Sequence, residues 1–138
     1  MLHIKLVNDR SEIFSKVKNV ADKIIQIRLD TGKYLVFSTQ ISNELKVDYN
    51  TFSNLFLSEY GVTPERVFAI RLVEKVKELL VYTEQSFKQI AIALGYNNPS
   101  SLSNTLKKYT GFTSTYFKEI RKNKLEIIRR QKLEQSEI

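Results

Sequence analysis

One segment of the sequence occurs twice, about fifty residues apart, and this repeat constrains the fold more than any other feature. Residues 41–63 read ISNELKVDYNTFSNLFLSEYGVT, and residues 90–113 read IAIALGYNNPSSLSNTLKKYTGFT. The isoleucines that open the two segments align at an offset of 49, and after one inserted residue Gly61 aligns with Gly111 at an offset of 50. A repeat of this length predicts one supersecondary element that is used twice.

Residues that break helices are scarce, and this predicts that the repeated element is helical. The chain has 2 prolines and 4 glycines, and no segment keeps the strict alternation of a strand. In the first copy Ser38 is expected to cap a helix that runs to Lys46, and Asp48 to cap the next helix, which ends at Gly61. Only Val47 and its neighbours are left for the turn. A connection this short is typical of a helix-turn-helix.

The second copy predicts the same two helices. Ser86 is expected to cap a helix over residues 87–94, and Gly95 opens the turn. Proline is tolerated only in the first turn of a helix, so the next helix is expected to start near Pro99 and to end at Gly111. The sequence therefore predicts an all-α fold with two helix-turn-helix subdomains.

Further helical segments set the expected domain limits. Apolar residues at three-and-four spacing over residues 11–29 predict an amphipathic N-terminal helix. Thr63 and Pro64 are a cap and a first-turn proline for a long connector helix that runs to about Leu80. The expected organisation is an N-terminal helical extension over residues 1–33, a central domain over residues 34–123, and a charged helical tail over residues 124–138. Within the central domain we expect helix-turn-helix one at 38–61, the connector helix at 64–80 and helix-turn-helix two at 86–111.

The composition narrows the function classes. The net charge is +7, with 22 Lys and Arg against 15 Asp and Glu, which favours a polyanionic partner. The absence of cysteine and the single histidine, His3, exclude disulfides, thiolate metal sites and Cys/His nucleophiles. No apolar run reaches the roughly 18 residues of a membrane span, and residues 1–10 lack the apolar stretch of a signal peptide. We therefore expect a soluble, cytoplasmic protein in which His3 has no catalytic role.

Residues 37–122 resemble the DNA-binding domain of the AraC/XylS family of bacterial transcription regulators. The most specific stretch, residues 90–116, is similar to the family pattern of IA, two spacers, LGY or LGF, a polar turn, a recognition helix ending in FKK, then G, T, P and an aromatic residue. Ser114 stands in place of the proline and Leu106 in place of the phenylalanine, and both keep the physical role of the residue they replace. The segment RLVEKVKELL, residues 71–80, is similar to the family's linker helix. The resemblance implies a sequence-specific regulator that binds double-stranded DNA.

The second helix of a helix-turn-helix enters the major groove, so its base contacts lie opposite its buried face. The buried face is expected to hold Phe52, Leu55, Phe56 and Tyr60 in the first copy, and Leu102 and Leu106 in the second. The expected base contacts are polar residues near the start of each second helix: Asn50, Thr51, Ser53 and Asn54, and Ser100, Ser101, Ser103 and Asn104. Asn54 and Asn104 occupy the same repeat position, and asparagine can bond adenine N6 and N7, so both are predicted to read A·T-containing steps.

Phosphate contacts are expected from basic side chains and from polar residues at helix starts. These contacts are Ser38, Ser86, Lys88, Asn98, Lys107, Lys108, Thr113, Lys118, Arg121 and Lys122. Residues 97–124 hold six basic residues and the single acid Glu119, whereas residues 38–61 hold one lysine and three acids. We therefore expect the second copy to be the electrostatic anchor and the first copy to be the weaker reader.

Two other function classes stay open. A helical protein-interaction module that has lost DNA readout would explain the near-neutral first recognition helix. An enzyme is disfavoured because the sequence has no phosphate-binding glycine loop, paired active-site carboxylates or His/Cys site. We expect double-stranded DNA and RNA polymerase as partners, with no cofactor, no metal and no membrane contact. A monomer is favoured over a dimer. Two roles are open for residues 11–29, a dimerisation helix or a lid over the core of the first subdomain, and we favour the lid.

Overall fold

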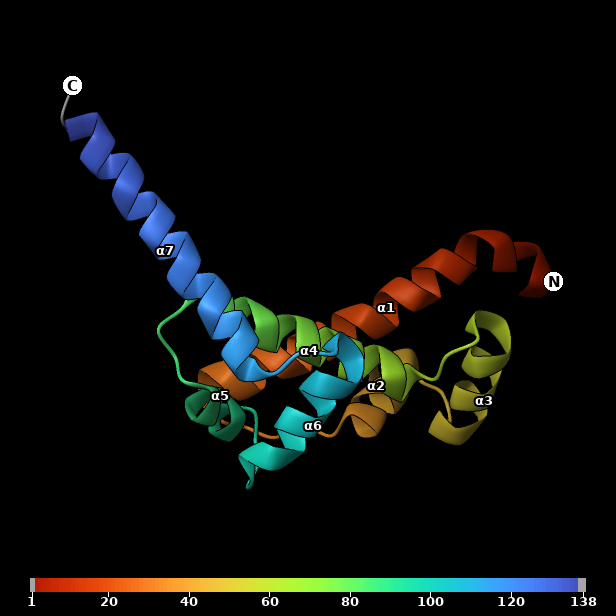
Figure 1. Cartoon of the computed structure of the whole chain (residues 1–138). Helices are drawn as coiled ribbons and strands as arrows, with labels where there is room; N and C mark the ends of the chain where they lie inside the picture. The colour runs from red at the N-terminus through yellow and green to blue at the C-terminus, as the bar shows by residue number, and fades with distance from the viewer. Residues whose placement is uncertain (1, 137–138) are drawn as a thin grey trace. The chain divides into compact units, whose positions relative to one another are not determined.

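The computed structural model describes the backbone of residues 2–136 and the side chains of residues 11–136. Over the described residues it consists of seven α-helices joined by short loops and contains no strand (Figure 1). The helices are α1 (Leu2–Thr31), α2 (Phe37–Leu45), α3 (Tyr49–Tyr60), α4 (Pro64–Tyr82), α5 (Phe87–Ala93), α6 (Pro99–Thr110) and α7 (Ser114–Ser136). The predicted all-α class is confirmed. The side chain of His3 and the last two residues of the predicted tail lie outside the described residues.

The chain divides into two compact units. The first holds the chain up to Leu72 together with Ala93–Gly95, and the second holds Val73–Ile92 and the chain from Tyr96 on. The pair α2 and α3 belongs to the first unit, α6 and most of α5 belong to the second, and α4 begins in one and ends in the other. The domain limits expected after residues 33 and 123 remain predictions.

The core of the first unit is built from α1, α2, α3 and the start of α4. Its buried members are Val17, Val20, Ala21, Ile24, Phe37, Ile41, Phe56 and Val67. Phe14 of α1 packs on Phe56 and Tyr60 of α3, with ring centroids 5.7 and 5.2 Å apart. Helix α1 therefore covers this core, as predicted for residues 11–29, although the helix begins earlier, at Leu2.

Two arginines fix α1 within the first unit. The Asp22 carboxylate accepts Nε and Nη2 of Arg71 at 2.8 and 2.9 Å, a bidentate pair that joins α1 to α4. Arg28 is only 6% exposed, and its guanidinium lies 4.1 Å from the centroid of the Tyr34 ring. Its Nη2 donates to the carbonyl of Leu35 at 3.2 Å. Arg28 thereby ties the end of α1 to the loop that leads into α2.

The start of α2 differs from the expectation. Ser38 is the predicted N-cap, but α2 begins at Phe37, and its N-cap is Val36, which makes no side-chain capping bond. The prediction of Ser38 as a cap is therefore wrong. Phe37 is 8% exposed and Ile41, one turn later, is fully buried. The burial of this pair sets the helix start, since packing routinely overrides local preferences.

The second unit buries apolar residues from each of its helices: Val76 and Leu80 of α4, Ile90 of α5, Leu102 and Leu106 of α6, and Phe117 of α7. Two basic side chains of α7 also bind carbonyl groups at and just after the end of α4. Lys118 Nζ donates to the Gln85 carbonyl at 2.5 Å, and Arg121 Nη1 donates to the Val81 carbonyl at 3.2 Å. Because the last carbonyls of a helix have no partner within it, Arg121 completes the C-terminus of α4.

Candidate nucleic-acid interface

The two helix-turn-helix copies share one turn geometry. Lys46 ends α2 with a φ of 56°, and Gly95, at the same repeat position, has a φ of 91°. In each copy the following N–H bonds the carbonyl five residues back, at 3.2 Å from Val47 and at 2.9 Å from Tyr96. This left-handed conformation suits glycine and strains lysine. The repeat is therefore preserved in backbone geometry even where the residue type differs.

Helix α3 carries the first set of predicted base contacts, and its limits agree with the sequence prediction. The carboxylate of its N-cap, Asp48, accepts the backbone N–H of Thr51 at 3.1 Å and the Thr51 hydroxyl at 2.9 Å. These two bonds hold the pKa of Asp48 below its usual value of 3.8. The helix ends at Gly61, which has a φ of 74°. Phe56 is buried, and Phe52 and Tyr60 are half-buried.

The predicted inward place of Leu55 is wrong. Its side chain is 65% exposed, whereas that of Phe56 is 2% exposed. Each residue of an α-helix turns by about 100°, so Leu55 is rotated away from Phe56 and lies on the side of Thr51, one turn earlier. Leucine is usually a core residue, but the position of Leu55 on the helix leaves its side chain exposed.

Helix α6 carries the second set and is built in the same way. The side chain of its N-cap, Asn98, accepts the Ser100 N–H at 2.9 Å, and Pro99 occupies the first turn as predicted. Leu102 and Leu106 are fully buried. The helix ends at Gly111 with a φ of 79°.

The predicted base contacts fall into two groups by exposure. Six are exposed: Asn50, Thr51, Asn54, Ser100, Ser101 and Asn104. The other two, Ser53 and Ser103, are half-buried and occupy matching positions of the repeat. Asn54 and Asn104 therefore lie exposed at one position of the repeat, opposite the buried faces, and the two serines beside the buried faces are less accessible.

Some of the predicted phosphate contacts use their side chains within the protein. Ser86 caps α5 reciprocally, because its hydroxyl accepts the Gln89 N–H at 3.1 Å while the Gln89 side chain accepts the Ser86 N–H at 2.9 Å. Lys118 and Arg121 bind the carbonyls near the end of α4, and Arg121 also bonds the Glu84 carboxylate and lowers its pKa. Ser38 is half-buried. Asn98 is exposed, but its side chain caps α6. The exposed remainder consists of Lys88, Lys107, Lys108, Thr113 and Lys122.

The second helices of the two helix-turn-helix copies, α3 and α6, present different chemical groups. Helix α6 has Lys107 and Lys108 in its last turn and no acid. At the matching positions α3 has Leu57 and Ser58, and its only charged residue is Glu59. A surface formed by α6 therefore attracts phosphate, whereas α3 offers neutral polar and apolar groups.

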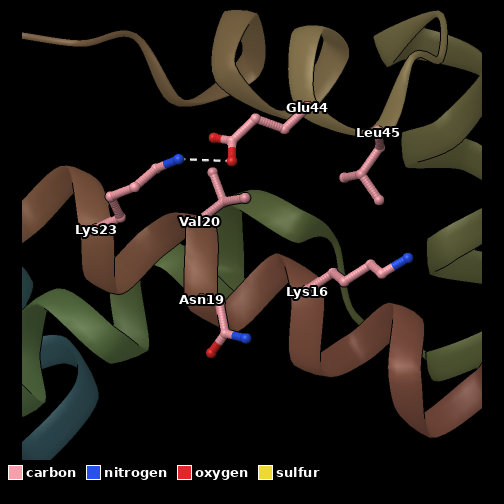
Figure 2. Close-up of a pocket in the computed structure, with 6 residues that line it drawn as sticks. All are labelled: Lys16, Asn19, Val20, Lys23, Glu44 and Leu45. Carbon is pink, nitrogen blue, oxygen red and sulfur yellow. Dashed lines mark hydrogen bonds and ion pairs between the residues drawn. The ribbon is translucent and has the colours of Figure 1, made fainter.

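A groove of about 390 Å³ lies between α1 and α2 within the first unit (Figure 2). It is lined by Lys16, Asn19, Val20, Lys23, Glu44 and Leu45. Lys23 binds Glu44 at 2.5 Å, and Lys16 lies 3.6 Å from Glu12. Figure 2 shows Asn19 pointing away from α2. The polar groups do not converge on one point, as those of a small-molecule site would.

The described part of the chain holds neither a cluster of metal ligands nor a membrane-spanning helix. No three His, Cys, Asp or Glu side chains among residues 11–136 are grouped so that they could hold a metal ion. None of the described helices combines the length and the apolar character needed to cross a membrane.

The fold of the chain is similar to the folds of several solved structures. The chain is similar to the C-terminal domain of AraT, a response regulator from Geobacillus stearothermophilus, with 23% identity, a TM-score of 0.59, and coverage of 76% of this chain and 84% of that one. It is similar to an AraC-type regulator from Chromobacterium violaceum, with 18% identity, a TM-score of 0.64, and coverage of 80% and 96%. A DNA-binding transcriptional dual regulator from Escherichia coli K-12 is similar at 18% identity and a TM-score of 0.59, and the match covers 78% of this chain and 93% of that one. No curated protein matches the chain.

Fold and site together define a protein with two helix-turn-helix elements. Residues 41–120, more than half of the chain, match the family described as a helix-turn-helix domain. The chain belongs to this family, the AraC-type helix-turn-helix domains. It is thus a DNA-binding domain of the kind found in transcription regulators. The sequence resemblance is confirmed.

Proposed function

We propose that the protein regulates transcription by binding a specific sequence in double-stranded DNA, with α3 and α6 as recognition helices in successive major grooves. The observation that carries the proposal is the structural repeat. The two copies bury Phe56 and Leu106 at one matching position, and at a second they hold the half-buried Phe52 and the buried Leu102. Each copy exposes an asparagine, Asn54 or Asn104, at a third matching position. Major grooves of one duplex face recur about 34 Å apart, so two readers in one chain suit an asymmetric site.

Base readout would come mainly from Asn54 and Asn104. Each is exposed, and neither is used in a helix cap. A bidentate asparagine–adenine pair contributes about 1 to 3 kcal/mol of discrimination. Thr51 is the weaker candidate, because its hydroxyl already donates to Asp48 at 2.9 Å. The two asparagines would therefore set an adenine preference in each half of the site.

Phosphate binding would come mainly from α6 and the basic residues near it. Lys107 and Lys108 are exposed in the last turn of α6, and Lys88 and Lys122 are exposed on α5 and α7. Lys118 and Arg121 would act differently, since their bonds to carbonyl groups hold α7 in place within the second unit. The protein would then bind as a monomer per site or half-site and contact RNA polymerase through another surface.

Site selection from a random duplex pool, followed by mobility shift at two salt concentrations, tests the proposal. Asn104→Ala should relax the preference at one base pair, and Asn19→Ala, an exposed asparagine of α1, is the matched control. Lys107→Ala should weaken binding to all sequences alike and lower the salt slope by about one unit. Lys16→Ala, also exposed, should leave the slope unchanged. A native chain that enriches no sequence would contradict the proposal.

The alternative of a protein-interaction module draws on one observation. Helix α3 exposes Leu55 at 65% and Leu57 at 44% and has no basic residue. DNA affinity that barely changes with salt, or that is absent, would favour this alternative, because phosphate binding always releases counterions.

A further inference from the structure

We propose that Leu55 of α3 recognises the 5-methyl group of thymine and thereby specifies a T·A pair in the half-site that α3 reads. The inference rests on the proposed function and adds the chemical class of one contacted group. It concerns a residue whose type suggests the core but whose side chain is 65% exposed.

Leu55 lies on the surface of α3 that carries the polar readers. Thr51 precedes it by one turn, and Asn54 is its neighbour in the chain. Phe56, the buried anchor of this helix, is 2% exposed and is rotated by about 100° from Leu55 around the helix axis. Leu55 is also absent from the apolar cluster that forms the core of the first unit. An exposed leucine one turn after Thr51, a predicted base contact, therefore lies along the edge of the surface that would face the major groove.

The chemistry of the major groove selects one partner for such a side chain. Thymine is the only base of unmodified DNA that presents a methyl group there, whereas the other bases present hydrogen-bond donors and acceptors. A leucine that covers those polar groups leaves them unpaired and costs free energy, but against a methyl group it buries apolar surface from both sides. Leu55 would therefore favour thymine and disfavour cytosine, which has no methyl group on C5 and presents an amino group in place of O4.

The absence of positive charge on α3 strengthens the inference. Tyr49–Tyr60 contains no lysine or arginine, so this helix cannot gain affinity through ion pairs with phosphate. In α6 the matching position is Thr105, which is half-buried and whose hydroxyl donates to the Ser101 carbonyl at 3.0 Å. The apolar contact would thus be specific to the first copy, in which non-ionic contacts must supply the binding energy.

The test removes one methyl group from the DNA and one side chain from the protein. After site selection with the full chain, each thymine of the half-site is replaced in turn by deoxyuridine, which lacks only the methyl group. One such replacement should weaken binding of the native chain by about three- to tenfold. Leu55→Ala should show a similar loss on unmodified DNA and no further loss with deoxyuridine at that position. Replacing a cytosine at the same position by 5-methylcytosine should restore part of the native affinity.

Leu133→Ala is the matched control, because Leu133 is also exposed, at 56%, but lies in α7 and not on a recognition helix. It should keep the full deoxyuridine penalty, and circular dichroism should show both variants folded. If the native chain binds its selected site and no deoxyuridine weakens it, or if Leu55→Ala keeps the penalty, the inference is wrong while the proposed function stands. If instead Leu55→Ala leaves DNA binding intact and abolishes self-association in sedimentation, Leu55 contacts protein and the inference is also overturned. A chain that selects no site refutes both.

Discussion

Replacing Ile24 by alanine tests whether α1 is part of the folded core of the first unit. Ile24 is fully buried among the residues that α1, α2, α3 and α4 contribute to that core. The change removes three carbon atoms, worth about 2.5 kcal/mol of transfer free energy. The cavity left behind raises the expected loss of unfolding free energy to about 3–4 kcal/mol, within the range of buried isoleucine-to-alanine changes.

The matched control is Ile127→Ala in α7. The two substitutions are chemically identical, but Ile127 is 54% exposed, so its loss should stay within about 0.5 kcal/mol. Urea unfolding followed by circular dichroism measures both free energies, and a thermal scan should show a midpoint lowered by roughly 10 °C for Ile24→Ala alone. An Ile24→Ala chain within about 1 kcal/mol of the native one would show that α1 does not pack as described.

Three further predictions concern caps and turns. Arg121→Ala removes a half-buried donor to the Val81 carbonyl and should lower the unfolding free energy by about 1–2 kcal/mol, measured in urea. Because the pKa of Asp48 is lowered in the folded state, its carboxylate stabilises the fold above pH 3.8, its usual pKa, and that contribution is lost as the pH falls through the folded pKa. The stability difference between the native chain and Asp48→Asn should therefore shrink on acidification, and a constant difference would refute this assignment. Lys46→Gly should raise the melting temperature by relieving its left-handed backbone, whereas Gly95→Ala should lower it, because a Cβ there would come 3.0 Å from the Tyr34 ring and the φ is 91°.

Local signals predicted most of the helix limits correctly. Asp48, Gly61, Pro99 and Gly111 each act on their own backbone, so their positions in the sequence determine where α3 and α6 begin and end. Ser38 failed as a cap because burial of Phe37, a contact with residues distant in the sequence, competes with capping. A local rule holds where no long-range contact opposes it.

The candidate interface was less predictable than the fold. Leu55 follows Phe52 by three residues, so the helical period places it about 60° from Phe52, at the edge of the buried face, and the period alone does not show whether it is buried. Lys118 and Arg121 carry the charge expected of phosphate contacts, yet their partners are carbonyls 33 and 40 residues earlier in the chain. No sequence pattern shows which lysines of a basic segment are held by the protein itself.

The bonds from α7 to the end of α4 also define where the second unit can be cut. The family match ends at residue 120, and a chain shortened there would lose Arg121 and leave the Val81 carbonyl without this donor. From Leu125 on, α7 is mostly exposed, and Leu125, Ile128 and Leu133 are 48%, 47% and 56% exposed. A chain cut after residue 120 should therefore be less stable than one that keeps Arg121, whereas removal of the exposed residues after Leu125 should cost little stability.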